Sequence, residues 1–295
     1  MSRRSASVRV PATSANLGPG FDSLGVALDW TVRISITVDD RPLERPQGPI
    51  DSMAATAALA LYRHAGIEAP ASLQADYEGD IPVGRGLGVS AFARVAGLVA
   101  ANKLIGGEYD DATLLALATR LEGHADNAAP ALLGGLQVTV ESDDGLKQIT
   151  IEPPDDLRVA LLIPNFSMPT EESRKQLPEQ LTRQEAVHNI GRAALLVAAF
   201  QQRRYDLLAT ATEDVLHQPA RGQMFEAMFP NFRAARDAGA LAVYLSGGGP
   251  TVAAFAVEGL DAIAEAMQAA AAEHDVQART KVTAMSTRGA ELLPD

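Results

Sequence analysis

Hydrophobic and polar residues alternate in two early segments of the chain, and this alternation predicts strands with one buried face. Residues 31–38 place an aliphatic side chain at every second position, and residues 73–77 repeat the pattern. A period of two sends successive side chains to opposite faces of a sheet, as in antiparallel sheets with one solvated face. Residues 8–11 predict a further short strand, which runs into a turn-rich segment at residues 12–23.

Longer apolar stretches that end near glycine predict helices. These stretches cover residues 53–65, 90–104 and 111–122, a short segment after Asn127, and residues 184–201 and 206–216. Glycine readily adopts the left-handed backbone that ends many helices, and the first four stretches stop near Gly66, Gly106, Gly123 and Gly134. Asp111 is expected to cap the third helix, since an aspartate side chain accepts hydrogen bonds from the free backbone N–H groups there.

The strands and helices interleave irregularly, and this order indicates the fold class. The remaining predicted strands cover residues 136–140, 159–163, 243–246 and 252–256, and a final helix and strand follow. A doubly wound fold would alternate strand and helix regularly, so we predict an α+β protein. Paired prolines and acids at residues 152–156 suit an exposed linker, so we expect two domains, residues 1–154 and 155–295.

The composition is that of a globular protein, and it excludes some function classes. The 295 residues are 47% hydrophobic, carry a formal net charge of −12 and include no cysteine. Nucleic acid is not expected as a partner because phosphate backbones require clustered Lys and Arg, whereas a small anion needs only a few backbone N–H groups. Disulfides and thiolate metal sites are excluded. With neither a membrane-length apolar run nor a signal-peptide pattern, we expect a cytoplasmic enzyme that does not bind a membrane.

A glycine-rich loop, Pro82-Val-Gly-Arg-Gly-Leu-Gly-Val-Ser-Ala91, precedes the second predicted helix. Its three glycines stand at every second position, so the backbone turns tightly and brings several N–H groups near a ligand. The helix that follows points its positive end at the same place, which favours a phosphate. Ser90 at the helix start either caps the helix or reaches a metal ion. The loop lacks the Gly-Lys-Ser/Thr of a Walker A motif, and plain turn formation is the competing interpretation.

The segment at residues 121–127 gathers polar side chains around a helix end. Glu122 stands at a helix C-terminus, where the helix dipole disfavours a carboxylate, so a magnesium ion beside it would remove that penalty. The alternative is a solvated surface glutamate. Asp126 or Asn127 either takes part in a site with His124 or caps the next helix, which is the commoner role.

Two further segments combine glycine with small polar residues. Residues 11–22 contain Asn16, which both donates and accepts hydrogen bonds, and Asp22, which can hold an ammonium group; a long capped loop is the alternative. Residues 245–252 include three consecutive glycines, which form either a tight connection between two strands or a close approach of backbone to a ligand.

Taken together and in this order, the four segments resemble the GHMP kinases, the family of galactokinase, homoserine kinase, mevalonate kinase and phosphomevalonate kinase. The N-terminal segment, the Pro-x-x-x-Gly-Leu-Gly-x-Ser loop and the late Ser-Gly-Gly-Gly-Pro-Thr turn match the three family signatures. Residues 13–22 and 122–135 are similar to homoserine kinases within that family. The resemblance implies a GHMP kinase fold, with an N-terminal domain like the second domain of ribosomal protein S5 and a ferredoxin-like C-terminal domain.

The resemblance also implies ligands and site residues. ATP is expected on the glycine-rich loop, at Pro82, Gly84, Arg85, Gly86, Leu87, Gly88, Val89 and Ser90. Mg²⁺ is expected at Ser90 and Glu122. L-homoserine is expected at Asn16, Asp22, His124, Asn127, Arg174, Arg221 and Gly247, of which Asn16, Asn127, Arg174 and Arg221 are also expected to act in catalysis. A guanidinium fork suits the carboxylate of an amino acid, and a carboxylate suits its ammonium group. A homodimer is the family-level expectation.

The chain departs from the family pattern at a few positions. Val89 and Phe92 stand where the family loop has serine and alanine, so one hydroxyl near the phosphates is lost and a small helix position is enlarged. Relatives of the mevalonate kinase type place an aspartate base near Asn127, which cannot take a proton, so we hypothesise phosphoryl transfer without a dedicated carboxylate base. The alternative functions are a GHMP kinase for another small hydroxyl substrate and a catalytically weakened relative that binds nucleotide or amino acid.

Overall fold

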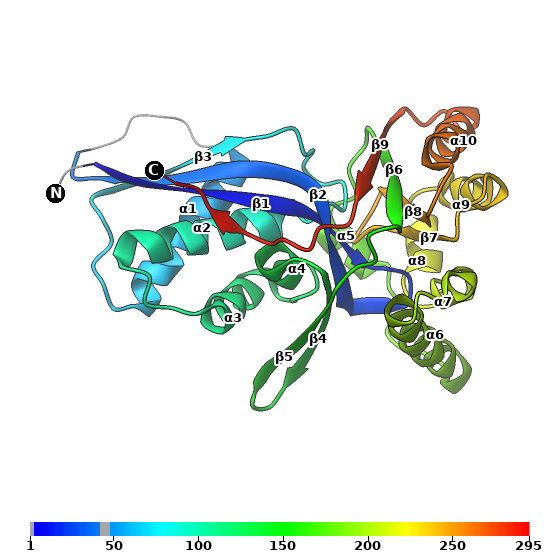
Figure 1. Cartoon of the computed structure of the whole chain (residues 1–295), viewed down its shortest axis with the longest axis horizontal. Coiled ribbons are helices and arrows are strands. Elements are labelled where there is room, and N and C mark those ends of the chain that lie inside the picture. The colour runs from blue at the N-terminus through cyan, green and yellow to red at the C-terminus, as the bar shows by residue number, and fades with distance from the viewer. Residues whose placement is uncertain (1–2, 42–47, 295) are drawn as a thin grey trace.

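The computed structural model describes residues 3–41 and 48–294, and within them it contains two antiparallel sheets (Figure 1). The first sheet has the strand order β10-β1-β2-β4-β5, with β3 paired to β2. Its strands are β1 (Arg4–Asn16), β2 (Gly20–Asp39), β3 (Ser72–Glu78), β4 (Leu136–Ser142), β5 (Gly145–Ile151) and β10 (Glu291–Leu292). The second sheet has the order β7-β8-β6-β9. Its strands are β6 (Arg158–Pro164), β7 (Ala242–Leu245), β8 (Val252–Ala256) and β9 (Ala278–Ala284).

Helices pack against both sheets, and together with the antiparallel strands they confirm the predicted α+β class. They are α1 (Pro49–His64), α2 (Val89–Ile105), α3 (Asp111–Glu122), α4 (Ala128–Leu133), α5 (Thr170–Lys175), α6 (Arg183–Gln201), the 3₁₀ turn η1 (Tyr205–Leu207), α7 (Leu208–Ala211), α8 (Gln218–Gly222), α9 (Met228–Asp237) and α10 (Leu260–Glu273). The helix α2 is buried on nearly all sides because it packs against α1, α3, α4 and β1. This burial fixes the place of its N-terminus, which directly follows the glycine-rich loop.

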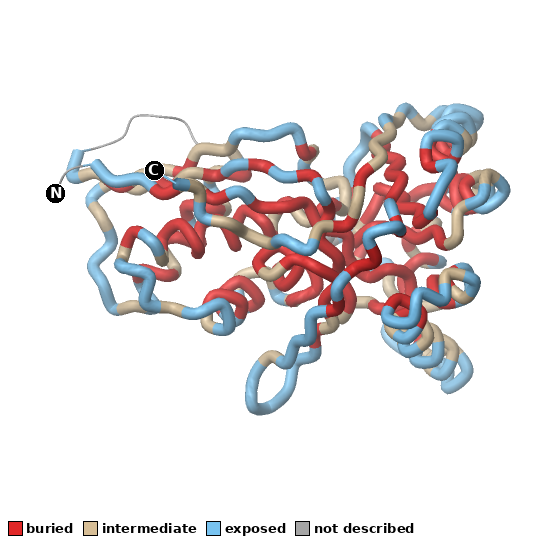
Figure 2. The backbone as a smooth tube through the Cα atoms, in the orientation of Figure 1, coloured by how far each residue is buried: buried red, intermediate tan, exposed pale blue. Residues whose placement is uncertain are grey.

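A single hydrophobic cluster runs through both sheets. This cluster contains Ile34 of β2 and Phe92 of α2, on the side of the first sheet. It also contains Leu161 of β6 and Phe255 of β8, in the second sheet. A further cluster packs the other face of the second sheet against α9 and α10. Because β6 and β8 are therefore covered on both faces, their sequences are continuously apolar rather than alternating. Figure 2 shows the buried backbone continuing between the two sheets.

The structure bears on two predictions about location and organisation. None of the described helices is long and apolar enough to cross a membrane. The signal-peptide prediction rests in part on Met1 and Ser2, which lie outside the described residues. The division into residues 1–154 and 155–295 stays a prediction.

Three local predictions were wrong. Residues 12–23 are not a turn-rich loop, since β1 continues to Asn16 and β2 resumes at Gly20 after a tight turn. Residues 206–216 do not form one helix, because α7 ends at Ala211 and the carboxylate of Asp214 then accepts the backbone N–H groups of residues 216–218. The cap of α3 is Asp110 rather than Asp111; its side chain accepts the backbone N–H of the third helical residue at 2.9 Å.

Several short elements were missing from the prediction. The strand β5 is mostly exposed, so it lacks the hydrophobic alternation by which strands are recognised. The helices α5 and α8 have six and five residues, too few for a helical period to show. The helix α9 was also missed, although Met228, Phe232 and Ala235 form a buried apolar face on it.

Candidate active site

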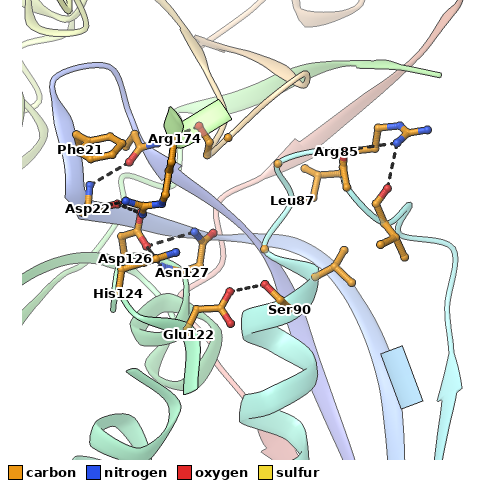
Figure 3. A pocket seen from close by; sticks show the side chains of 18 of the residues that line it. Phe21, Asp22, Arg85, Leu87, Ser90, Glu122, His124, Asp126, Asn127 and Arg174 are labelled. Atoms are coloured by element: carbon orange, nitrogen blue, oxygen red, sulfur yellow. Dashed lines mark hydrogen bonds and ion pairs between the residues drawn. The ribbon is translucent and has the colours of Figure 1, made fainter. Parts of the chain in front are cut away.

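A cleft of about 200 Å³ lies where the glycine-rich loop, the β1–β2 turn and the second sheet meet (Figure 3). It is lined by Asn16, Phe21, Asp22, Met53, Val83, Gly84, Arg85, Gly86, Leu87, Gly88, Val89, Ser90, Glu122, His124, Asp126, Asn127, Arg174, Arg221, Gly247 and Gly248. The structure thus brings together every residue that the sequence assigned to nucleotide, metal or substrate, except Pro82, which is not in the lining. Residues more than two hundred positions apart meet in this cleft.

The glycine-rich loop closes one end of the cleft. Gly84, Gly86 and Gly88 all have positive φ, at 69°, 73° and 69°, a conformation that glycine adopts without strain. A side chain at Gly86 would collide with the backbone carbonyl of Ser246, whose hydroxyl donates to the Gly86 carbonyl at 2.7 Å. Because Gly88 is the N-cap of α2, free backbone N–H groups of the first helical turn lie at the cleft. This end of the cleft is therefore suited to an anion.

Glu122 and Ser90 face each other beside the loop. The hydroxyl of Ser90 donates to Oε1 of Glu122, and the guanidinium of Arg94 forms an ion pair with Oε2. Ser90 therefore does not cap its helix with its side chain. The Glu122 side chain is only 7% exposed, so it is not the solvated surface residue of the alternative interpretation. Arg94 offsets the cost of a carboxylate at the C-terminus of α3, and burial lowers the pKa of Arg94.

The opposite end of the cleft carries the charges of the β1–β2 turn and α5. Arg174 donates to both carboxylate oxygens of Asp22, at 2.9 and 2.5 Å, and its guanidinium lies 5.2 Å from the centre of the Phe21 ring. Asn16 has φ of 69°; its Nδ2 donates to the Gly247 carbonyl at 2.9 Å, and its Oδ1 accepts the backbone N–H of Asp22 at 3.1 Å. The turn is thereby tied to the glycine turn after β7.

His124, Asp126 and Asn127 form a hydrogen-bonded row across the floor of the cleft. Nδ1 of His124 bonds to Oδ1 of Asp126, which also accepts the backbone N–H of Asn127 at 2.9 Å. Burial lowers the pKa of His124, but the hydrogen bond and charge of Asp126, with the charge of Asp22, outweigh it and leave this pKa above its ordinary value. Neither Asp126 nor Asn127 caps α4 through its side chain, because Asn127 stands at the N-cap without such a bond and its Oδ1 accepts from Thr13 at 2.8 Å.

Two sets of residues carry ligand atoms suited to a hard cation. Ser90 and Glu122 offer oxygens beside the N-terminus of α2, and Asp22, His124 and Asp126 bring ligand atoms within 4.8 Å of one another. The second set is already engaged by Arg174 and by its internal hydrogen bonds. The first set lies at the anion-binding end of the cleft, where a cation would meet a bound phosphate.

Arg221 reaches the cleft from α8 and is 1% exposed. Its Nη1 donates to the Gly247 carbonyl at 3.0 Å and contacts Nδ1 of His217 at 2.9 Å. Burial, together with the nearby charge of Arg174, lowers the pKa of Arg221 to about 10, so it remains protonated at neutral pH. Arg221 and Arg174 thus bring two cationic groups to the same end of the cleft as Asp22.

The sequence did not identify several residues that support the site, namely Thr13, Phe21, Arg94, His217 and Ser246. A signal existed for two of them. Arg94 follows Ser90 by one helical turn, and His217 precedes Arg221 by four residues, so each spacing predicts side chains on one helical face. The partners of Thr13 and Ser246 are more than a hundred positions away in the chain, and no local pattern points to them.

The two unusual residues of the loop have different surroundings. Phe92 is fully buried, and its ring stacks on Tyr77 with centroids 6.4 Å apart, so the larger side chain fills the core rather than the cleft. Val89 lines the cleft at the first residue of α2. The loss of a hydroxyl at position 89 is therefore the departure that concerns the nucleotide end.

Family models agree with this fold and this cleft. The GHMP kinases N terminal domain matches residues 52–135, and the GHMP kinases C terminal matches residues 196–277. The chain belongs to the GHMP kinases and is an ATP-dependent kinase of a small molecule. Its curated relatives include the homoserine kinases of Moorella thermoacetica, 41% identical over 97% of this chain and 99% of the relative, and of Carboxydothermus hydrogenoformans, 38% identical over 96% and 95%. Within the GHMP kinases the chain is thus a member of the homoserine kinase family.

Solved structures support the same placement. The crystal structure of homoserine kinase from Cytophaga hutchinsonii has a TM-score of 0.88 at 28% identity, and the similarity covers 98% of this chain and 97% of that one. Mevalonate diphosphate decarboxylase from Staphylococcus aureus has a TM-score of 0.72 at 16% identity, covering 99% and 98%. The second likeness shows the fold alone, and both agree with the predicted GHMP kinase fold.

Proposed function

We propose that this chain transfers the γ-phosphoryl group of ATP to the side-chain hydroxyl of L-homoserine, forming O-phospho-L-homoserine on the route to threonine. The observation that carries the proposal is a cleft with an anion-binding glycine loop at one end and the group Asp22, Arg174 and Arg221 at the other. The first end suits a polyphosphate, and the second suits an amino-acid zwitterion. The homoserine kinases among its relatives support the same substrates.

The loop residues 84–90 would hold the phosphates of ATP through backbone N–H groups. Positive φ at three alternate glycines and the start of α2 point such groups at one place. The carbonyls of Gly86 and Arg85 accept hydrogen bonds from Ser246 and Thr251, in the turn between β7 and β8. These bonds hold the loop before any ligand arrives, so little ordering is needed on binding.

Ser90 and Glu122 fit a magnesium ion. Mg²⁺ prefers oxygen ligands, and these two side chains already present a hydroxyl and a carboxylate in contact with each other beside the phosphate end. When bound, Mg²⁺ would neutralise charge on the transferred phosphoryl group. Arg94 would keep the Glu122 carboxylate in place while Ser90 releases its hydrogen bond.

The amino acid would bind at Asp22 and Arg174, and its charged groups would replace part of the ion pair between these two side chains. The ammonium group of homoserine suits the Asp22 carboxylate, and its carboxylate suits the guanidinium groups of Arg174 and Arg221. Asn16 contacts Asp22, and the Gly247 carbonyl accepts a hydrogen bond from Arg221. His124 and Asn127 lie nearer to Glu122 in the same cleft (Figure 3). This placement directs the side-chain hydroxyl of homoserine toward the phosphate end.

The transfer would form a bond from the homoserine oxygen to the γ-phosphorus and break the bond to the bridging oxygen of ADP, and the hydroxyl proton would leave with the phosphoryl product or water. Asn127 cannot take this proton, and Asp126 already accepts hydrogen bonds from His124 and from Asn127. We therefore expect positioning and charge neutralisation to supply the catalysis. Asp126→Asn should retain measurable kcat in a folded protein, and loss of nearly all kcat would show that a carboxylate base is needed.

The test is a coupled ADP-release assay with ATP and Mg²⁺ that compares L-homoserine, mevalonate and no acceptor. We expect turnover that depends on homoserine, is abolished in Glu122→Ala and is sharply weakened in Arg221→Ala. The matched control is Glu213→Ala, which removes a carboxylate whose partner is the surface residue Arg192. Turnover with mevalonate instead would favour another small hydroxyl substrate, and ligand-induced stabilisation without any turnover would favour a binding protein. A cytoplasmic location and a homodimer stay predictions.

A further inference from the structure

His217 is a fully buried histidine whose two ring nitrogens contact two different parts of the candidate site. Its Nε2 lies 2.7 Å from the carbonyl oxygen of Gly18, in the β1–β2 turn, and its Nδ1 lies 2.9 Å from Nη1 of Arg221. A carbonyl oxygen only accepts, so Nε2 carries the proton and donates it to Gly18. Nδ1 is then a lone pair, and it accepts from the guanidinium of Arg221.

The charge state of the ring agrees with this assignment. Burial lowers the pKa of His217 to about 4, so the ring is neutral at physiological pH. A protonated ring would present an N–H group to the N–H group of Arg221, and that hydrogen bond would be lost. The neutral form with hydrogen on Nε2 is therefore the form that satisfies both neighbours.

The hydrogen bonds of Arg221 use only one edge of its guanidinium. Nη1 donates to His217 and to the carbonyl of Gly247, whereas Nε is buried and has no hydrogen-bond partner among the described residues. A buried donor without a partner is costly unless a ligand satisfies it. Arg221 lines the cleft, so we expect a substrate carboxylate to satisfy the edge of the guanidinium that His217 and Gly247 leave free.

His217 is itself held in place from its backbone. Oδ2 of Asp214 accepts the backbone N–H of His217 at 3.0 Å and that of Gln218 at 2.7 Å. Oδ1 of Asp214 accepts from Nδ2 of Asn189 at 2.7 Å, which joins this segment to α6. These hydrogen bonds fix the backbone of His217, so its ring is held between the β1–β2 turn and α8.

We propose that His217 is a positioning residue for the amino-acid substrate, which holds one edge of Arg221 so that the other edge meets the substrate carboxylate. The second hydrogen bond of His217, to Gly18, fixes the position of Arg221 relative to the β1–β2 turn, which carries Asp22. The carboxylate site and the ammonium site are thereby held at a fixed separation. The inference rests on the proposed function, because it assigns the substrate carboxylate to Arg221.

Two substitutions separate the two hydrogen bonds of the ring. The carboxamide of asparagine reaches only the position of Nδ1, so His217→Asn retains an acceptor for Arg221 and loses the donor to Gly18. The longer glutamine reaches the position of Nε2, so His217→Gln retains the donor to Gly18 and loses the acceptor for Arg221. We expect His217→Gln to raise the KM for homoserine about 10- to 100-fold while the KM for ATP changes less than about twofold. His217→Asn should raise the KM for homoserine less, and it should lower Tm more.

His274→Gln on the exposed end of α10 is the matched control, and it should leave both KM values unchanged. In a double-mutant cycle, the effects of His217→Gln and Arg221→Lys on kcat/KM for homoserine should be strongly non-additive, because both break the same contact. An unchanged homoserine KM in His217→Gln, additive effects, or equal losses for both ligands in the two His217 variants would overturn the inference. These outcomes require a wild-type enzyme that phosphorylates homoserine, so absence of wild-type turnover identifies failure of the proposed function instead.

Discussion

Charged side chains at the amino-acid end of the cleft are paired before substrate arrives. Arg174 bonds Asp22 through two hydrogen bonds, and Arg221 is buried with one edge engaged. A desolvated guanidinium with defined partners loses little freedom when a carboxylate binds, so such a site gains affinity through its prior order. The disadvantage is that the hydrogen bonds of these buried polar groups persist only while each group keeps its protonation state.

The buried ring of His217 predicts that the stability of the protein depends on pH. The folded pKa of His217, about 4, lies below the ordinary value of 6.5, so the unfolded chain binds more protons between these values. Stability therefore falls as pH drops from about 6.5 toward 4. Between pH 7 and pH 5, we expect the wild type to lose roughly 2 kcal/mol of unfolding free energy through this residue.

The measurement is urea unfolding of wild type and His217→Asn at the two pH values. The variant has no titrating group at this position. Between pH 7 and pH 5, the unfolding free energy of the variant should therefore fall less than that of the wild type, by roughly 2 kcal/mol. Equal pH slopes for both proteins would show that the pKa of His217 is the same in the folded and the unfolded chain. Such a result would also contradict its role as an acceptor for Arg221.

Local chemistry explains which site residues the sequence could reveal. Asn16 and Asp22 stand in a short segment whose small polar residues and glycines exceed what a turn needs, and Glu122 stands at a helix C-terminus, where a carboxylate is disfavoured. Arg221 was expected only from the resemblance to the GHMP kinases, and all four residues line one cleft. The role of His217 depends on the carbonyl of Gly18, which lies 199 positions away in the chain. A contact of that kind is formed by the fold, so no periodicity or spacing could predict it.

At the scale of elements, the glycine-rich loop depends on close backbone contact as well as on positive φ. Gly86→Ala should place a methyl group against the backbone of Ser246 and Gly249 and displace the loop. We expect it to destabilise the protein by about 3 kcal/mol or more and to raise the KM for ATP. Gly107 has a similar φ of 76° with open space around it, so Gly107→Ala should cost only about 1 kcal/mol.

Thermal unfolding and ATP kinetics of the two variants test this difference. The shared left-handed strain cancels between them, and the remaining difference is the collision at position 86. If both alanine variants keep wild-type ATP kinetics, then the loop is free to move and its packing against the second sheet does not position ATP.

Elements were predictable where their signal was local. The alternation in residues 31–38 and the apolar stretch at 90–104 correspond to β2 and α2, because burial on one face or on all faces leaves a clear pattern. Residues 206–216 look helical by composition, yet Asp214 binds the backbone N–H groups that a continuing helix would have used. Competition between a side chain and the helix backbone depends on geometry that composition does not contain.

At the scale of the molecule, the shared hydrophobic cluster predicts cooperative unfolding. Trp30 of β2 is the single tryptophan, and its ring is contacted by Lys281 and Arg279 of β9. Its Nε1 donates to Asp80 at 2.7 Å. Its fluorescence therefore reports the junction of the two sheets. We expect urea unfolding followed by Trp30 fluorescence and by far-UV circular dichroism to give one transition with the same midpoint. Two separate midpoints would instead support residues 1–154 and 155–295 as independently stable domains.

The pairing of β10 with β1 has a consequence for how the protein is made. Glu291 and Leu292 lie opposite Arg9 and Val8, yet Glu291 leaves the ribosome 282 residues after Arg9. Until then, β1 has no neighbouring strand on this edge at Val8 and Arg9, and Gly247 likewise reaches Asn16 only after a long stretch of chain has been made. An open strand edge invites pairing with other chains, so the nascent protein passes through an interval in which it is most prone to aggregate. The cleft can be completed only after Gly248, the last of its lining residues along the chain, has been made.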